Sequence, residues 1–306
     1  MCDRDVMTDT RVGDKVSFGA RKAVCASVPC TCGELFQGSL DGEPCLVSCP
    51  IDVYSVARVT ERETTSEKGP APGRKVQTAL TKLALPAESA TRVTVSSPLP
   101  AGRGYGTSTA DIGAALYAAS RAAGIELDVM DAVRIAVSVE PTDSTFLPGL
   151  ALLDHRQGRF HELLGAPPGL RLLVLDAGGY VDTESFNRQN WNDALRLMAA
   201  DHRRAYDLLR LGIARGDPEG IGEAATLSAR LHETILPNPL VGAARRLIRR
   251  VGAVGLCRAH SGTVVGLLFD SRCFDEERSF REVVGSVPRG VTLRRAALVE
   301  GGARFT

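Results

Sequence analysis

The stretch Pro98–Asp111, PLPAGRGYGTSTAD, says most about the fold. It carries glycine at three alternate positions, Gly102, Gly104 and Gly106, and an alanine-rich run without proline follows over residues 108–123. Glycine lets a backbone adopt positive φ angles and approach a ligand closely. The first turn of a helix presents free N–H groups and the positive end of the helix dipole. A glycine-rich loop that leads into a helix is therefore predicted to bind phosphate groups.

This loop differs from two common nucleotide-binding motifs. It lacks the Gly-Lys-Ser/Thr ending of a Walker A loop. It also lacks the dinucleotide fingerprint, because the third glycine comes one residue early and no acidic residue follows at the required place. Glycine spacing alone leaves a second interpretation open, a glycine-rich turn whose Thr or Ser caps the helix.

Strand-like and helix-like segments alternate along the rest of the chain, which predicts a mixed α+β fold. Strands are expected at residues 46–59 (one or two strands around Pro50), 92–96, 172–175, 264–269 and 291–299. Helices are expected at residues 108–123, along the apolar stripe from Trp191 to Leu209, and at 221–235 and 240–250. The polar stretch 61–74 is expected to be an exposed loop. The sequence GAPPG at residues 165–169 suggests a boundary between two domains, at 23–167 and 168–306. Residues 1–22 mix charges of both signs and are expected to be a flexible extension.

Composition narrows the classes of function. The 306 residues have a formal net charge of +1, which gives no reason to expect nucleic-acid or anionic-membrane binding. No run of 18 apolar residues predicts a membrane span, and residues 1–22 lack the apolar core of a secretory signal. We therefore expect a cytoplasmic protein that holds its anionic ligand at a local site.

Four of the eight cysteines, Cys30, Cys32, Cys45 and Cys49, lie close together in the sequence. A zinc site is one interpretation, but this spacing is not a common ligand pattern. Cys45 and Cys49 also belong to an apolar run, where free cysteine behaves as a small buried hydrophobic residue. Burial is the favoured interpretation.

Six ordered motifs resemble those of the GHMP kinases, and within that superfamily they are most similar to L-threonine kinases of propanediol utilisation and cobalamin synthesis. The phosphate loop matches the family pattern at Pro100, Gly104, Gly106, Ser108 and Ala110, whereas Tyr105, Thr107 and Thr109 depart from it. The other motifs are CGELFQG (32–38), CPID (49–52), EPTDS (140–144), DAGGYVDTESFN (176–187) and AHSGTVVGLLFD (259–270). The likeness covers nearly the whole chain from about residue 28 onward.

The resemblance implies a two-domain GHMP kinase fold and transfer of the γ-phosphate of MgATP to an alcohol, L-threonine in the most similar family. It implies that ATP lies beside the glycine-rich loop. The residues expected to bind the nucleotide are Pro100, Gly102, Arg103, Gly104, Gly106, Thr107, Ser108 and Thr109. Ser108 is also a candidate ligand of Mg²⁺, together with Glu140, because hard cations prefer oxygen ligands. The alternatives are a plain helix cap for Ser108 and a surface carboxylate for Glu140.

Phosphoryl transfer often uses a carboxylate that receives the proton of the attacking hydroxyl. Asp143 is the candidate for that base, and the alternative is a carboxylate that only caps a turn. Glu34 is a candidate partner for the ammonium group of an amino acid, and Asp52 and Asp182 are weaker candidates for the same kind of role. The other residues expected at the acceptor site are His260, Ser261, Gly262 and Thr263.

Two other functions remain open from the sequence. The first is a GHMP kinase for another alcohol, such as homoserine, pantoate or an amino acid of specialised metabolism. The second is a GHMP-fold protein that binds a ligand without catalysis, against which the presence of Ser108 and Asp143 argues.

Overall fold

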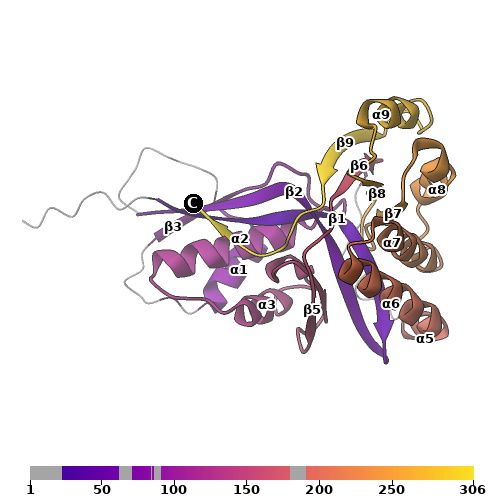
Figure 1. Cartoon of the computed structure of the whole chain (residues 1–306). Helices are drawn as coiled ribbons and strands as arrows, with labels where there is room; N and C mark the ends of the chain where they lie inside the picture. Colours follow the sequence, from indigo (N-terminus) through magenta and orange to yellow (C-terminus); the bar gives the residue numbers. More distant parts are fainter. Residues whose placement is uncertain (1–22, 62–70, 84, 86–90, 180–190) are drawn as a thin grey trace, which may run out of the picture.

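The computed structural model describes residues 23–61, 71–83, 85, 91–179 and 191–306, and within them ten strands form one sheet (Figure 1). The strands are β1 (Val24–Leu40), β2 (Glu43–Glu61), β3 (Thr91–Ser96), β4 (Leu150–Leu153), β5 (His161–Gly165), β6 (Leu170–Asp176), β7 (Gly255–Arg258), β8 (Val265–Asp270), β9 (Thr292–Ala297) and β10 (Arg304–Phe305). Their order is β5-β4-β2-β1-β7-β8-β6-β9, with β3 paired to β2 and β10 paired to β1. Every pairing between these strands is antiparallel.

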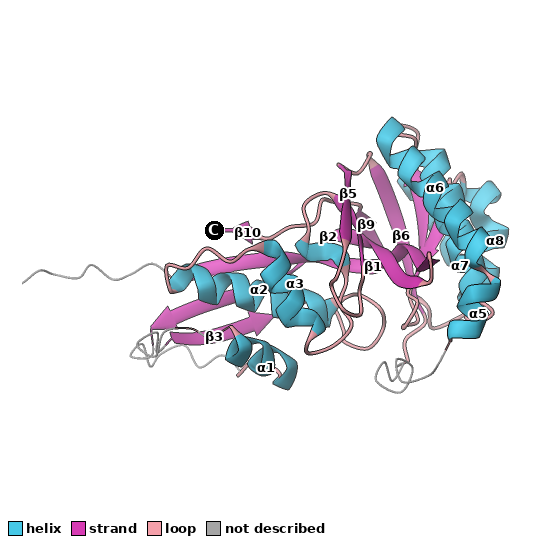
Figure 2. Cartoon of the chain, turned by 90° about the horizontal axis from the view of Figure 1, so that it is seen from below, coloured by secondary structure: helices cyan, strands magenta, loops and turns pink. Residues whose placement is uncertain are grey.

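The helices gather in two groups at opposite ends of this sheet, as both views show (Figures 1 and 2). One group contains α1 (Arg74–Lys82), α2 (Thr107–Ala122) and α3 (Val129–Val137). The other contains α5 (Asn192–Leu197), α6 (Ala199–Arg215), α7 (Pro218–His232), α8 (Pro239–Val251) and α9 (Glu276–Val284). Strands β1 and β2 run between the two groups. Both strands contact α2 in the first group, and β1 also contacts α6 and α7 in the second.

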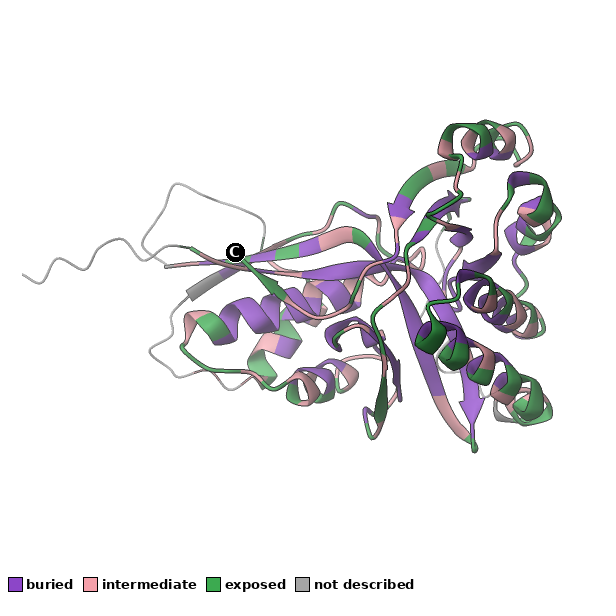
Figure 3. Ribbon diagram, in the orientation of Figure 1, coloured by how far each residue is buried: buried purple, intermediate pink, exposed green. Residues whose placement is uncertain are grey.

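Helix α2 is the most deeply buried helix, and most of its residues lose their contact with solvent (Figure 3). Its alanine-rich sequence explains this burial, because small side chains let the helix pack closely against β1 and β2. The helix begins at Thr107, directly after the glycine-rich loop, so the buried packing fixes the position of that loop. Burial of this first group therefore positions the predicted phosphate site.

Most of the predicted elements are confirmed. The strands expected at 92–96, 172–175, 264–269 and 291–299 are β3, β6, β8 and β9, and the helices expected at 221–235 and 240–250 are α7 and α8. Residues 46–59 belong to one continuous strand, β2. Pro50 is tolerated within it because the facing strand is irregular there, with register shifts on both sides of Thr31.

One helix prediction was wrong. The stripe from Trp191 to Leu209 was expected to form one long helix, but the backbone leaves helical geometry at Met198 and divides it into α5 and α6. Only α6 buries an apolar face, whereas Leu197 in α5 is 88% exposed. Without a core to pack against, the first segment gains little from continuing the helix. Helices α1 and α3 were not anticipated.

The predicted domain boundary between residues 167 and 168 falls between β5 and β6 and remains a prediction. The sheet itself continues across it, because β1 pairs with β2 on one side and with β7 on the other. The proposed extension at residues 1–22, most of the predicted loop at 61–74 and Asp182 lie outside the described residues. Within those residues, no helix has the length and apolar character needed to cross a membrane.

Candidate active site

A cavity of about 450 Å³ opens beside the glycine-rich loop, a volume typical of small-molecule sites. Its walls come from β1, the start of α1, the glycine-rich loop with the first turn of α2, the segment Glu140–Asp143, and the turn between β4 and β5. These elements are far apart in sequence and meet at the place where α2 begins. The cavity is therefore the natural position for a ligand that carries phosphate at one end.

The N-terminus of α2 is open to a ligand. Its first internal hydrogen bond runs from Ala110 N to Gly106 O at 2.9 Å, and no side chain caps the helix. The N–H groups of residues 107–109 thus have no partner within the helix and form an anion-binding end. The Thr or Ser cap considered from the sequence is absent: Gly106 occupies the cap position, with a positive φ of 61°.

Neighbouring backbone holds the loop in place. Gly33 N donates to Gly104 O at 3.1 Å, and Thr31 N donates to Tyr105 O at 2.8 Å. Thr263 N donates to Arg103 O at 2.9 Å. The segments around Gly33 and Thr263 are two of the motifs that the sequence singled out, and here they support the loop. These bonds engage the loop carbonyl groups and leave the N–H groups of the helix end available.

Ser108 and Glu140 lie together at the loop. Ser108 Oγ donates to Glu140 Oε1, and Lys75 Nζ forms an ion pair with Glu140 Oε2. A hydroxyl oxygen and a carboxylate side by side are ligands that suit Mg²⁺, and the adjacent ammonium suits phosphate. The residues present therefore fit a magnesium–nucleotide complex.

The sequence did not single out Lys75, which directly follows the stretch 61–74 that was expected to be a loop. Helix α1 brings it to the cavity together with Arg74. The signal was present in the sequence: Val76 and Ala79 are spaced for one helix face, they are both buried, and proline is absent after Gly73.

Arg103 does not serve the cavity. Its guanidinium binds Asp176 Oδ2 at 3.0 Å, and the hydroxyl of Tyr105 donates to the same oxygen at 3.1 Å. Neither Arg103 nor Pro100 lines the cavity, whereas Gly102, Gly104, Gly106, Thr107, Ser108 and Thr109 all do. Six of the eight predicted residues therefore line the cavity, whereas Arg103 supports the loop through Asp176 and Pro100 lies outside the lining.

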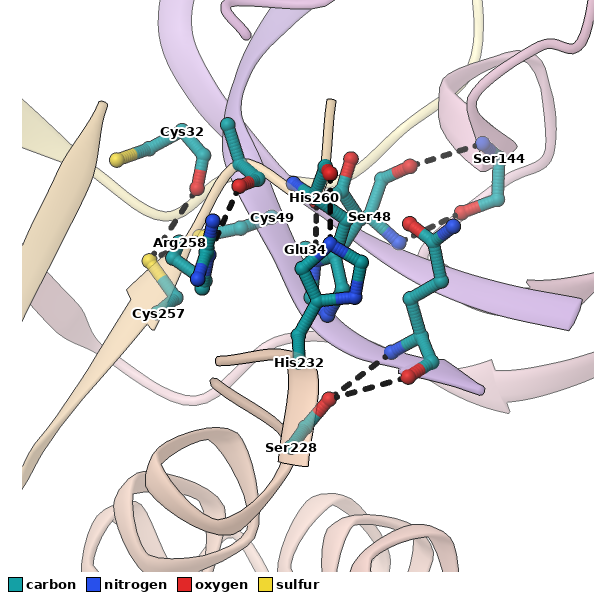
Figure 4. Close-up of polar contacts among 12 residues, drawn as sticks. Cys32, Glu34, Ser48, Cys49, Ser144, Ser228, His232, Cys257, Arg258 and His260 are labelled. Carbon is teal, nitrogen blue, oxygen red and sulfur yellow. Dashed lines mark hydrogen bonds and ion pairs between the residues drawn. The ribbon is translucent and has the colours of Figure 1, made fainter. Parts of the chain in front are cut away.

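Asp143 lines the cavity close to the start of α2. Its backbone N–H donates to Thr109 Oγ1 at 3.1 Å. The next residue, Ser144, exchanges two hydrogen bonds with Ser48 on β2, of 3.1 and 2.9 Å (Figure 4). Burial, together with the negative charge of Glu34, raises the pKa of Asp143 to about 7, although hydrogen bonds from Thr109 and Ser48 oppose this shift. A carboxylate with this pKa can take up a proton near neutral pH.

Glu34 enters the cavity from an irregular part of β1, with register shifts on both sides of it. Its Oε2 accepts hydrogen bonds from His260 N at 2.9 Å and from His260 Nδ1 at 2.8 Å (Figure 4). Burial raises the pKa of Glu34 to about 8, and burial holds the pKa of His260 well below its usual range. His260 is thus a neutral hydrogen-bond donor that orients Glu34, rather than a positive partner.

The other predicted acceptor residues have different positions. Ser261 lines the cavity. Gly262 packs below the loop, where an added Cβ would meet Gly104 Cα at 2.5 Å, and Thr263 is the backbone donor to Arg103. Asp52 is exposed on β2, outside the cavity lining, and accepts a hydrogen bond from Ala297 N at 2.8 Å. The structure therefore brings Glu34 and Ser261 to the cavity and does not bring Asp52 there.

The early cysteines pack inside the protein. All four early cysteines are buried, and Cys257 joins two of them: its thiol donates to Cys32 O at 3.2 Å and lies 3.8 Å from Cys49 Sγ (Figure 4). Among the described residues no group of three or more His, Cys, Asp or Glu side chains could hold a metal ion. Burial also raises the pKa of Cys30 to about 12, which keeps that thiol protonated.

Comparisons with known proteins agree with this geometry. The family model "GHMP kinases N terminal domain" matches residues 74–147, and "GHMP kinases C terminal" matches residues 205–282. The chain is 36% identical to an L-threonine kinase of Salmonella typhimurium over 83% of this chain and 85% of that protein. It is 35% identical to an L-threonine kinase of Citrobacter freundii, over 82% and 88% of the two chains.

The fold has relatives among solved structures. The homoserine kinase of Cytophaga hutchinsonii superposes with a TM-score of 0.65 over 99% of this chain and 100% of that chain, at 13% identity. At this identity the likeness concerns the fold alone. Together with the matched family models and the two relatives, it confirms the fold expected from the motifs: the chain belongs to the GHMP kinase family.

Proposed function

We propose that this GHMP kinase transfers the γ-phosphate of ATP to the side-chain hydroxyl of L-threonine, giving O-phospho-L-threonine and ADP. The observation that carries the proposal is one cavity that is lined both by the open N-terminus of α2 and by the carboxyl-bearing residue Asp143. Phosphate binding and proton transfer need those two features close together. The similarity to L-threonine kinases over more than four-fifths of the chain supports the acceptor.

The nucleotide end is built from the loop and α1. The N–H groups at the start of α2 bind the phosphate oxygens, and Lys75 and Arg74 neutralise their charge. Ser108 and Glu140 would hold Mg²⁺, and the bound ion would neutralise charge on the phosphates. Arg103 supports the loop through Asp176 and does not touch phosphate.

The acceptor end is built around Asp143. Its carboxylate accepts the proton of the substrate hydroxyl as that oxygen bonds to the γ-phosphorus, and the bond from phosphorus to the bridging oxygen of ADP breaks. The raised pKa suits this role, because a base with a pKa near the working pH is both deprotonated and strong enough to take a proton. Thr109 fixes the backbone of Asp143 to the first turn of α2, so the base and the phosphate site move as one unit.

Glu34 binds the ammonium group of the amino acid. Its Oε2 is engaged by His260, and its second oxygen has no hydrogen-bond partner among the described residues. An ammonium beside this buried carboxyl supplies the positive partner that neutral His260 does not, and it stabilises the ionised form of Glu34.

The test is ADP release with MgATP and a panel of L-threonine, L-serine, D-threonine, L-homoserine and pantoate. We expect L-threonine to have the highest kcat/KM, with L-serine about 10- to 200-fold lower because it lacks the methyl group. If homoserine or pantoate exceeds L-threonine by about tenfold, the kinase activity stands and the acceptor is wrong. If no member of the panel stimulates ADP release while ADP binds, the proposal of catalysis on these alcohols fails.

A further inference from the structure

The turn between β4 and β5 carries an arginine, Arg156, that the motifs did not include and that lines the cavity. The turn is organised by Asp154, whose carboxylate accepts from Arg156 N at 3.2 Å and from Gln157 N at 3.1 Å. The other oxygen of Asp154 binds Arg159 Nε at 2.9 Å. Burial opposes ionisation of Asp154, but these hydrogen bonds outweigh it and hold its pKa below the usual range. The turn is therefore ordered before any ligand binds.

The same turn is tied to the proposed base. Thr142 N donates to His155 O at 2.9 Å, so the residue before Asp143 is bonded to the residue before Arg156. The strand before the turn, β4, is linked to β1 through β2, because Leu46 on β2 pairs with both Gln37 on β1 and Leu153 on β4. Arg156 thus lines the same cavity as Glu34, on a turn bonded to the segment that carries Asp143, which is the end proposed to hold the acceptor.

The guanidinium of Arg156 is not neutralised by any carboxylate of the described residues. The nearest acidic residue in sequence, Asp154, binds Arg159 instead, which also pairs with Glu43. Beside Arg156, His155 is 6% exposed and its Nδ1 has no hydrogen-bond partner within the same residues. An arginine without a carboxylate partner on a hydrogen-bonded turn, next to an unsatisfied buried ring nitrogen, points to a missing polar ligand.

The other basic residues near the cavity bind different partners or lie at the phosphate loop. Arg258, directly before the motif at 259–270, is fully buried, pairs with Glu233 and does not line the cavity. Lys75 lies at the phosphate loop against Glu140, and Arg74 precedes it on the same helix. The described residues that line the cavity include three arginine or lysine side chains, and Arg156 is the one that does not belong to the start of α1 beside the phosphate loop.

We propose that Arg156 binds the α-carboxylate of the acceptor and so selects free amino acids over other small alcohols, an inference that rests on the proposed phosphorylation of an amino acid. A guanidinium presents two parallel N–H donors that match a carboxylate. Arg156 then holds one charged group of the acceptor while Glu34 holds the other. Two fixed charges of opposite sign orient the amino acid between them, with its hydroxyl toward Asp143.

The test compares L-threonine with L-threoninamide, which keeps the shape and the ammonium but has no negative charge. In the wild type, kcat/KM for L-threonine should exceed that for L-threoninamide by about 10- to 150-fold, the range of a hydrogen bond to a charged group. Arg156→Gln should lower kcat/KM for L-threonine by a similar factor and change L-threoninamide by less than about threefold. Arg156→Lys should retain part of the preference, because the charge remains without the paired donors. The KM for MgATP should be unchanged in both variants.

Arg134→Gln is the matched control, because it removes the same charge from an exposed ion pair on α3 outside the cavity. It should behave as wild type with both acceptors. Equal losses of kcat for L-threonine and L-threoninamide in Arg156→Gln would assign Arg156 to the transferred phosphoryl group and overturn the inference. Unchanged kinetics in Arg156→Gln would overturn it as well. If the wild type phosphorylates neither acceptor but binds ADP, the proposed function has failed rather than the role of Arg156.

Discussion

Replacing Gly104 by alanine tests whether close backbone packing sets the position of the phosphate loop. A Cβ at this position would lie 2.1 Å from Ala259 Cβ and 3.2 Å from Gly262 Cα, whereas ordinary contact begins at 3.4 Å. The φ angle of +91° adds strain for any side chain. The loop must therefore move by more than about 1 Å, a misplacement that can cost about 10²-fold in rate.

A double-mutant cycle separates the steric effect from backbone strain. Ala259→Gly removes the nearest atom, so Gly104→Ala combined with Ala259→Gly leaves the 3.2 Å contact as the closest one. We expect the double variant to recover about tenfold or more of the lost kcat/KM for MgATP, because only a few tenths of an ångström then need to be relieved.

Gly124→Ala is the control for strain alone. Gly124 also has a positive φ, of 71°, but a Cβ there would meet nothing within 4 Å. Its cost should be about 1–2 kcal/mol of stability with kcat/KM unchanged. The measurements are initial rates of ADP release and thermal unfolding of all four variants. Wild-type kinetics in Gly104→Ala, or a double variant no better than the single one, would refute the role of this contact.

Three further predictions concern the proposed chemistry. Asp143→Asn should lower kcat by about 10²- to 10⁴-fold with ADP affinity unchanged, and a loss under about threefold at saturating substrate would remove Asp143 from proton transfer. Since Asp143 must be ionised to act as a base, kcat at saturating L-threonine should rise with pH through about 7, the raised pKa of this group, and then level off. A kcat that does not change between about pH 6 and pH 8 would contradict this role. Ser108→Ala should raise the Mg²⁺ concentration needed for half-maximal activity and lower kcat/KM for MgATP while the unfolding temperature falls by only a few degrees, and unchanged magnesium dependence would exclude Ser108 as a ligand.

Part of the cavity was predictable because it is local in sequence. The phosphate loop and its helix follow from glycine spacing and an alanine-rich run within some twenty residues. The placement of Ser108 beside Glu140 follows less directly, because the two residues belong to separate motifs whose contact depends on the packing of α2. The resemblance to family motifs identified both residues as candidates, but it did not predict the hydrogen bond between them.

Other parts depended on contacts that no local pattern records. Arg103 lies within the glycine-rich loop and was expected to bind the nucleotide, yet a buried carboxylate 73 positions later, Asp176, holds it away from the cavity. Asp52 belongs to a motif but lies on β2 with its side chain exposed to solvent. Lys75 and Arg156 belong to no motif and reach the cavity through α1 and the β4–β5 turn.

The resemblance of six ordered motifs was enough to indicate the family. Hydrophobic periodicity, glycine and helix-start signals act over a few residues, so the sequence by itself also determined the order of most strands and helices and the loop proposed to bind phosphate. Only the tertiary structure decided which charges meet in the cavity. Burial of Glu34 and Asp143 in one space raises both pKa values, and the pairing of Asp154 with Arg159 leaves Arg156 without a carboxylate partner among the described residues. Desolvation and charge pairing depend on distances across the sheet, and those distances are set by long-range packing rather than by neighbours along the chain.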